Sequence, residues 1–348
     1  MRPPEVTIVS PTEATEVAAT DVVLRFKVAQ AGELKSVVVM NNGRPIPTFR
    51  PITAPSKGDT VETTVPLVPG ENILMVMAEN QFAYSKPATV IVRRKGEEKY
   101  TLPRVFVLAI GVSDYERKEY KLAFAHFDAI GIARAFQGQK DKLWREVYVK
   151  TLTNREATRA NVVDALDEFL RKATQEDLVI VSVSGHGVQD QTGDFYFIPC
   201  DGEFEKLRST AVNWFEFRKT VAELPGKVLV LVDACHSGAV DQKGRKAIDT
   251  NRLIREFQLA GGGVITLASS TGAEVSQEHE KWQHGAFTFA LLEGLREGKA
   301  DLYKDGVIKV SELLAYVKNR VPELTDYRQH PTSYQPESVP DFAIWKVE

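Results

Sequence analysis

The pattern of hydrophobic and polar positions changes once along the chain and divides it into two regions. Over the first 95 residues, short apolar runs alternate with turn-forming Gly, Pro and Asn. The runs are VTIV, VVLRFKV, SVVVM, ILMVMAE and TVIVRR, and two of the turns are NNGRPIP and VPGEN. Many short strands separated by such turns are typical of an all-β sandwich. We therefore predict an immunoglobulin-like β-sandwich over residues 1–95.

A charged stretch, RRKGEEKYTLP, interrupts this pattern and predicts a linker over residues 96–103. Beyond Pro103, apolar runs alternate with amphipathic segments. Strands are expected at residues 104–111, 145–152, 177–184, 227–233 and 263–269, and helices near 122–137, 158–173, 250–260, 285–297 and 310–321. Such alternation predicts an α/β fold with a mostly parallel sheet flanked by helices, over residues 104–348.

The composition narrows the classes of partner. The chain has 348 residues, enough for two domains, and a formal net charge of −3 that gives no sign of nucleic-acid or anionic-membrane binding. Its two cysteines cannot form a disulfide framework, and no run approaches the roughly 20 apolar residues that span a bilayer. We expect a cytoplasmic protein whose partners are proteins or small molecules, with no nucleic acid and no membrane among them.

Two predicted strands run into reactive side chains. The strand at 177–184 leads into SGHG, and the strand at 227–233 leads into DACHSG. Loops at the carboxyl ends of parallel strands are where α/β proteins collect ligands. A thiolate needs an imidazole beside it for proton transfer, so His186 and Cys235 are candidates for a catalytic pair, placed at the solvent edge of their strands. The alternative is a buried structural thiol and glycines that only form turns.

The two boxes, 49 residues apart, resemble the histidine and cysteine boxes of the caspase-like cysteine peptidases, in particular the metacaspase and orthocaspase branch. The resemblance extends over residues 104–345, through RVFVLAIGVSDY, KLAFAHFDA, NREATRANVVDAL, FYFIPCD, VITLASSTGAEVS, HGAFTFALLEGLREGKAD and VIKVSELLAYVKNRV. It implies that Cys235 is the nucleophile that forms a thioester and that His186 is the acid/base. The backbone N–H groups of Gly187 and Cys235 would bind the oxyanion.

The resemblance also implies a specificity pocket. Caspases have Gln where this chain has Asp233, and Asp128, Asp233 and Ser184 match the polar members of the metacaspase pocket. Two carboxylates favour a guanidinium or ammonium group, so cleavage after Arg or Lys is expected. The alternative for Asp128 is an acid that complements a helix N-terminus. Ala125 replaces a cysteine that the family's pocket tends to have, which alters one wall.

Metal sites and cofactors are not predicted. Cys200 is expected to be a structural thiol, because the close ligand spacings of zinc sites are missing. Calcium dependence stays open: Asp201 and Asp241 lie near positions that the resemblance would give to calcium ligands, but few oxygen ligands accompany them.

The polar, basic stretch at 241–252 is either a solvated loop or a processing site, with Lys243, Arg245 and Lys246 as the residues cut. The sequence thus predicts a cysteine endopeptidase that acts on proteins after basic residues and is activated by proteolysis. The sandwich would bind a regulatory protein or restrain the protease. A catalytically silent caspase-fold scaffold and an acyl transferase remain alternatives.

Overall fold

The structure is a computed structural model that describes residues 3–12, 15–29, 33–46, 60–95, 102–235, 250–259, 263–271 and 274–348. It forms two compact units. One comprises residues 1–101 together with 336–340, and the other comprises residues 102–335 and 341–348. Most of the predicted linker lies outside the described residues, so the predicted domain boundaries stay a prediction.

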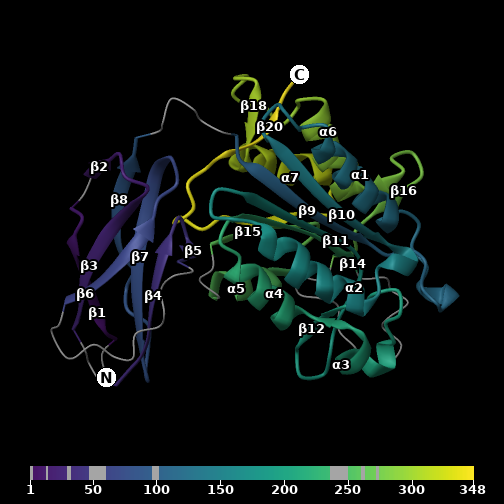
Figure 1. The fold of residues 1–348 in the computed structure, drawn as a ribbon. Coiled ribbons are helices and arrows are strands. Elements are labelled where there is room, and N and C mark those ends of the chain that lie inside the picture. The colour runs from purple at the N-terminus through teal and green to yellow at the C-terminus, as the bar shows by residue number, and fades with distance from the viewer. Residues whose placement is uncertain are drawn as a thin grey trace. The chain divides into compact units, whose positions relative to one another are not determined.

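The first unit is built of two sheets (Figure 1). One has the strand order β1 (Glu5–Ser10), β3 (Asp21–Ala29), β6 (Thr60–Pro66), and the other has the order β2 (Thr15–Val17), β8 (Ala88–Arg94), β7 (Gly70–Asn80), β4 (Leu34–Asn41), β5 (Arg44–Pro45). Alternate side chains of both sheets share one hydrophobic core, among them Leu24, Phe26, Leu74 and Val76. This arrangement fits an immunoglobulin-like domain. Strands β2, β5 and β6 were not predicted.

The second unit is organised around one mixed sheet (Figure 1). Its strand order is β10 (Glu146–Thr153), β9 (Arg104–Gly111), β11 (Leu178–Gln189), β14 (Lys227–Cys235), β15 (Val264–Ala268), β19 (Thr332–Tyr334). All neighbours are parallel except β19, which runs antiparallel to β15. The end of β11 also pairs with β12 (Phe195–Phe197), which pairs with β13 (Val212–Asn213). The prediction of a mostly parallel sheet is confirmed.

Helices cover both faces of this sheet, as predicted (Figure 1). One face carries α1 (Ala125–Gln137), α6 (Ala286–Arg296) and α7 (Val310–Leu324), and the other carries α2 (Arg159–Asp164), α4 (Trp214–Glu223) and α5 (Thr250–Leu259). The shorter elements are α3 (Leu207–Thr210), the π-helical turn η3 (Ala165–Phe169), the 3₁₀ turns η1 (Lys118–Tyr120), η2 (Asn154–Glu156), η4 (Leu170–Lys172) and η5 (Phe204–Lys206), and two hairpins, β16 (Glu278–His279) with β17 (His284–Gly285) and β18 (Val307–Lys309) with β20 (Ala343–Lys346).

Strand alternation decides which side chains face which helices. The valines at 179, 181 and 183 of β11 and at 228, 230 and 232 of β14 pack in the core on the α2, α4 and α5 side. Because successive side chains point to opposite faces, Ser184 and Asp233 point to the face that carries α1, where the Ser184 hydroxyl donates to Asp128. The sheet therefore gathers a polar row beneath α1 at its carboxyl edge.

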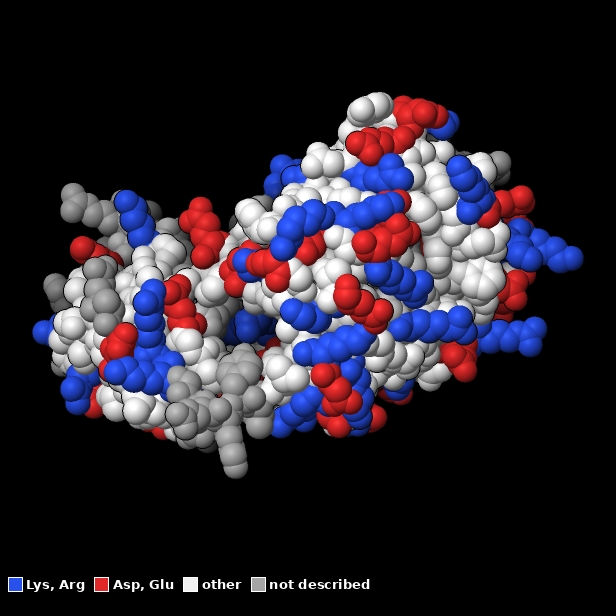
Figure 2. All heavy atoms as spheres, turned by 90° about the horizontal axis from the view of Figure 1, so that it is seen from above, with Lys and Arg blue, Asp and Glu red and all other residues white. Residues whose placement is uncertain are grey.

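Charges of both signs are mixed on the face of the second unit that Figure 2 shows, where Lys and Arg side chains are interspersed with Asp and Glu. Within the described part of the chain, none of the helices is long and apolar enough to cross a membrane.

Close packing of α1 on β9 depends on Gly111, and we predict its effect on stability. A Cβ atom there would overlap the Ala125 carbonyl oxygen and lie 2.8 Å from the Ala129 Cβ atom. Because this obstacle is helix backbone, Gly111→Ala should lower the free energy of unfolding by about 1–3 kcal/mol. Urea titration would measure it, with Gly138→Ala as control, since φ at Gly138 is −69° and its nearest contact would be at 3.3 Å. Equal stabilities of the two variants would contradict the role given to Gly111.

Candidate functional site

The two reactive boxes lie side by side in the sheet. In the parallel pairing of β11 with β14, His186 is the register partner of Cys235 and Ser184 is the partner of Asp233. The strands are longer than predicted, since β11 continues through SGHG and β14 continues through Cys235. His186 is completely buried, so the prediction that its side chain lies at a solvent edge is wrong.

His186 is enclosed by aromatic rings. The ring centroids of Tyr115, Tyr120 and Phe204 lie 4.8, 6.2 and 6.0 Å from that of the imidazole. The Nε2 atom of His186 lies 2.7 Å from the Tyr120 carbonyl oxygen. Because a carbonyl oxygen can only accept a hydrogen bond, the neutral ring carries its proton on Nε2. Nδ1 is then the basic nitrogen of the ring.

The Tyr115 hydroxyl accepts a backbone hydrogen bond from β11 where the neighbouring strand β9 has ended. β9 pairs with β11 only as far as the Gly111–Ser184 partners, and beyond that point the His186 N–H donates to the Tyr115 hydroxyl at 2.8 Å. A Cβ atom on Gly185 would lie 2.9 Å from this hydroxyl, and φ at Gly185 is +151°, so the position requires glycine. Sequence reasoning missed Tyr115, although it stands in the quoted segment RVFVLAIGVSDY.

The amide of Gly187 faces β14. The His186 N–H and C=O groups both point away from β14, because the carbonyl accepts from Ile198 N at 2.9 Å and the N–H donates to Tyr115. Backbone groups of successive strand residues point to opposite sides. The N–H of Gly187 therefore points towards the strand that ends at Cys235.

The three predicted pocket residues come together beneath α1. Asp128 is buried and accepts hydrogen bonds from Ser184 Oγ and from Gly285 N, each at 3.2 Å. A Cβ atom on Gly285 would lie 3.0 Å from Asp233 Oδ2 and 3.4 Å from Asp128 Oδ2, so both carboxylates face Gly285. Asp128 does lie in the first turn of α1, but these bonds tie its carboxylate to the sheet and to β17.

Two further residues join this cluster from the β16–β17 hairpin, and sequence reasoning missed both. The Glu278 carboxylate accepts from Ala123 N at 3.0 Å and from Phe124 N at 3.3 Å. His284 Nδ1 lies 2.8 Å from Asp128 Oδ1. The hairpin is two residues long on each side, and no local pattern in the sequence indicates where it docks.

The electrostatics of the cluster favour a positively charged ligand. Burial, and then the nearby Asp233 carboxylate, raise the pKa of Asp128 well above its usual value, and burial also raises the pKa of Glu278. Burial, with the positive charge of Arg296, lowers the pKa of His284 to about 4, so its ring is neutral at pH 7 and does not compensate the carboxylates. A cation placed between Asp128 and Asp233 would relieve the cost of keeping them charged.

The other predicted residues lie elsewhere or are not described. Cys200 is half-buried, and burial raises the pKa of its thiol. Asp201 accepts a hydrogen bond from Arg159 N at the start of α2. Among the described residues, no three His, Cys, Asp or Glu side chains are grouped so that they could hold a metal ion. Asp241 and the processing candidates Lys243, Arg245 and Lys246 lie outside the described residues.

Solved structures similar to this chain include the following three. Protein GSU0716 from Geobacter sulfurreducens is 23% identical over 67% of this chain and 93% of its own, with a TM-score of 0.48. The structure of pro-sf-caspase-1 is 13% identical over 68% of this chain and 89% of its own, with a TM-score of 0.39. The fibronectin(III)-like modules of CbhA from Clostridium thermocellum are 20% identical over 26% of this chain and 99% of their own, with a TM-score of 0.21.

No curated protein matches the chain. The family model described as the caspase domain matches residues 104–342, which include the whole sheet of the second unit and both boxes. This match covers more than half of the 348 residues, and it agrees with the mixed sheet flanked by helices and with the paired His186 and Cys235 positions. The chain belongs to the caspase domain family.

Proposed function

We propose that this chain is a cysteine endopeptidase that hydrolyses proteins after Arg or Lys. The observation that carries the proposal is the pairing of His186 with Cys235 in adjacent parallel strands, two residues beyond the paired Ser184 and Asp233. Membership of a family of cysteine peptidases supports the reaction class. The buried carboxylates beneath α1 support the preference for a basic residue.

The proposed reaction has two steps. The Cys235 thiolate attacks the carbonyl carbon before the scissile bond, and His186 delivers a proton to the leaving amine as the C–N bond breaks, which leaves a thioester. Water then adds to the thioester carbonyl, His186 accepts its proton, and the C–S bond breaks. The Nε2 hydrogen bond to Tyr120 supports this role, since it leaves Nδ1 to exchange the proton. The N–H groups of Gly187 and Cys235 would stabilise the oxyanion.

The specificity pocket of the proposal holds a guanidinium or ammonium group between Asp128 and Asp233. The carboxylates converge on Gly285, whose lack of a side chain keeps the space between them open. Ser184 orients Asp128 through its hydroxyl. Glu278 adds a third, half-buried carboxyl group, and the nearby Asp233 carboxylate helps to raise its pKa. Arginine can bind such a pair bidentately.

One observation favours a different function. The side chain of His186 is completely buried. This burial is what we would expect of a residue that serves only for packing in a catalytically silent scaffold. Incubating the protein with a peptide library, with and without calcium, separates the possibilities, because hydrolysis releases fragments and an acyl transferase forms a new amide. The same mass spectra would reveal any cut in the protein itself at Lys243, Arg245 or Lys246, where the proposed processing would occur.

Removal of the nucleophile tests the proposed mechanism. Cys235→Ala and His186→Asn should each lower kcat for an arginine peptide by about 10³-fold or more, and the double variant should lose little beyond either single one, because the two act as a unit. Release of a fluorophore measures the rate. Cys200→Ala is the matched control and should keep full activity. Loss of activity in Cys200→Ala, with Cys235→Ala still active, would reassign the nucleophile.

Replacement of the pocket acids tests the specificity. Asp128→Asn and Asp233→Asn should each lower kcat/KM for arginine substrates by about 100-fold, because the substrate cation loses one partner of a buried ion pair. The exposed Asp167→Asn should be unchanged. Peptides with aspartate before the cut should be poor substrates, and their cleavage at the rate of arginine peptides would contradict the pocket.

The pH dependence of cation binding follows from the raised carboxyl pKa values. Agmatine, a guanidinium compound, should bind Cys235→Ala more tightly as the pH rises, because a cation prefers the ionised acids. As the pH is lowered, the affinity should begin to fall at a pH above the ordinary aspartate pKa of about 4, because the acids take up protons early. Binding of the cation should release these protons. Calorimetry in buffers of different ionisation enthalpy measures both effects. An affinity independent of pH would mean that the ligand does not meet these carboxylates.

A further inference from the structure

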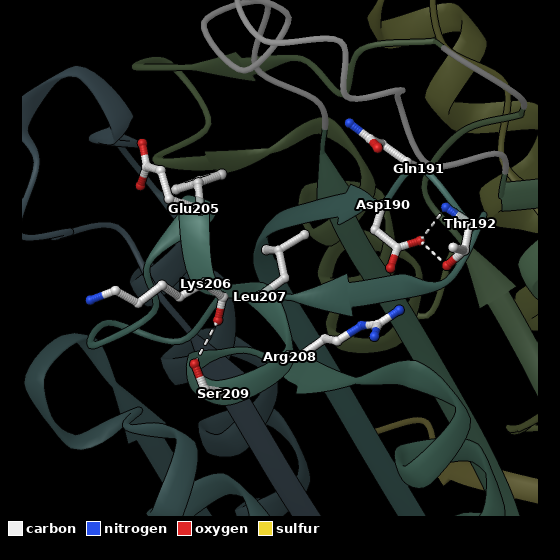
Figure 3. A pocket seen from close by; sticks show the side chains of 9 residues that line it. Asp190, Gln191, Thr192, Glu205, Lys206, Leu207, Arg208 and Ser209 are labelled. Carbon is white, nitrogen blue, oxygen red and sulfur yellow. Dashed lines mark hydrogen bonds between the residues drawn. The ribbon is translucent and has the colours of Figure 1, made fainter.

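A pocket lies close to His186, and Figure 3 shows the side chains that line it. Its volume is about 590 Å³, and it is lined by the turn that follows β11 and by the segment from η5 into α3, residues 190–192 and 204–209. Phe204 belongs to this lining, and its ring contacts those of His186 and Tyr120 at centroid distances of 6.0 and 4.1 Å. Only one aromatic ring therefore separates the pocket from the imidazole.

The proposed reaction indicates which part of a substrate would lie near this pocket. His186 must deliver its proton to the leaving amine, so the peptide that departs has to lie against the histidine. The acids Asp128 and Asp233, by contrast, bind the residue before the cut, and they lie on α1 and β14. A pocket next to His186 is thus placed to receive a side chain that follows the scissile bond.

Three of the four charged groups in the lining are already engaged within the protein. The Asp190 carboxylate accepts from Thr192 N and Asp194 N, each at 2.9 Å, and from the Thr192 hydroxyl at 2.7 Å. Glu205 forms a two-pronged ion pair with Arg117, at 2.9 and 3.1 Å, and Lys206 pairs with Glu203 at 2.9 Å.

Arg208 is the exception. Its side chain is exposed and extends into the same part of the pocket as Asp190 (Figure 3), and among the described residues it makes no ion pair and no hydrogen bond. Because a guanidinium group offers a fork of donors that matches a carboxylate, the unused donors of Arg208 can bind an anionic group that enters the pocket.

We infer that this pocket is a subsite for an acidic residue on the leaving side of the scissile bond, with Arg208 as its specificity-determining residue. The inference rests on the proposed function, and it adds a second requirement to the basic residue before the cut. Substrates would carry opposite charges on the two sides of the cleaved bond. Such a pair of requirements restricts cleavage far more than a lone arginine does.

Internally quenched peptides test this inference. Each contains one arginine before the cut, and Glu, Gln or Lys is placed in turn at each of the first few positions after it. The wild-type protein should prefer Glu over Gln at one of these positions by about fivefold in kcat/KM, as one partly exposed charge-assisted pair allows. Arg208→Gln should remove the preference, and Arg208→Glu should shift it to Lys. The exposed Arg134→Gln, on α1, is the matched control and should keep the preference for Glu.

Each outcome decides the question. A wild-type protein that cleaves the Gln and Glu peptides equally at every position overturns the subsite and leaves the proposed function intact. A preference for Glu that persists in Arg208→Gln also overturns the assignment of Arg208. A wild-type protein that cleaves none of the peptides overturns the proposed function, and the subsite with it.

Discussion

Everything at the candidate site depends on one register, the parallel pairing of β11 with β14. These strands lie in the middle of the sheet, and their valines are locked into the core beneath α2, α4 and α5. A slip by one residue would turn those valines towards α1 and the polar row into the hydrophobic core. Hydrophobic packing far from the chemistry therefore fixes which residue of β14 stands opposite His186.

The same architecture explains why the acids can stay buried. Asp128 and Asp233 converge on Gly285 of the β16–β17 hairpin, and the pKa of Asp128 is raised mainly by burial. Carboxylates in such a place are costly unless they are hydrogen-bonded, and Asp128 is bonded to a side chain of β11 and a backbone amide of β17. These bonds join α1 to the sheet and to the β16–β17 hairpin at one carboxylate. A basic ligand between the carboxylates would favour their ionised form and so offset the cost of burial.

Sequence patterns predicted the parts that repeat along the chain and missed those that depend on tertiary contacts. The apolar runs of β9, β11 and β14 were found because a buried parallel strand is nearly all hydrophobic. β6 was missed because only Val61 and Val65 of its seven residues are deeply buried, and Thr and Glu occupy much of the rest. Asp128, Ser184 and Asp233 were predicted from a family resemblance. Glu278 and His284 reach the site from the β16–β17 hairpin, and no local sequence pattern indicates where that hairpin docks. The burial of His186 was missed because rings distant in sequence provide it.

The contact between Tyr115 and Gly185 has a consequence for how this sheet can vary among related chains. The phenol hydroxyl occupies the space that a side chain at 185 would need, and it supplies the partner that β9 no longer offers to the backbone of His186. Neither position can therefore change freely by itself. A relative with a shorter residue at 115 would have to find another acceptor for that amide, and one with a side chain at 185 would have to give up the phenol. The two positions, 70 residues apart, should be inherited together as a unit, and an alignment of related chains would show them varying in concert.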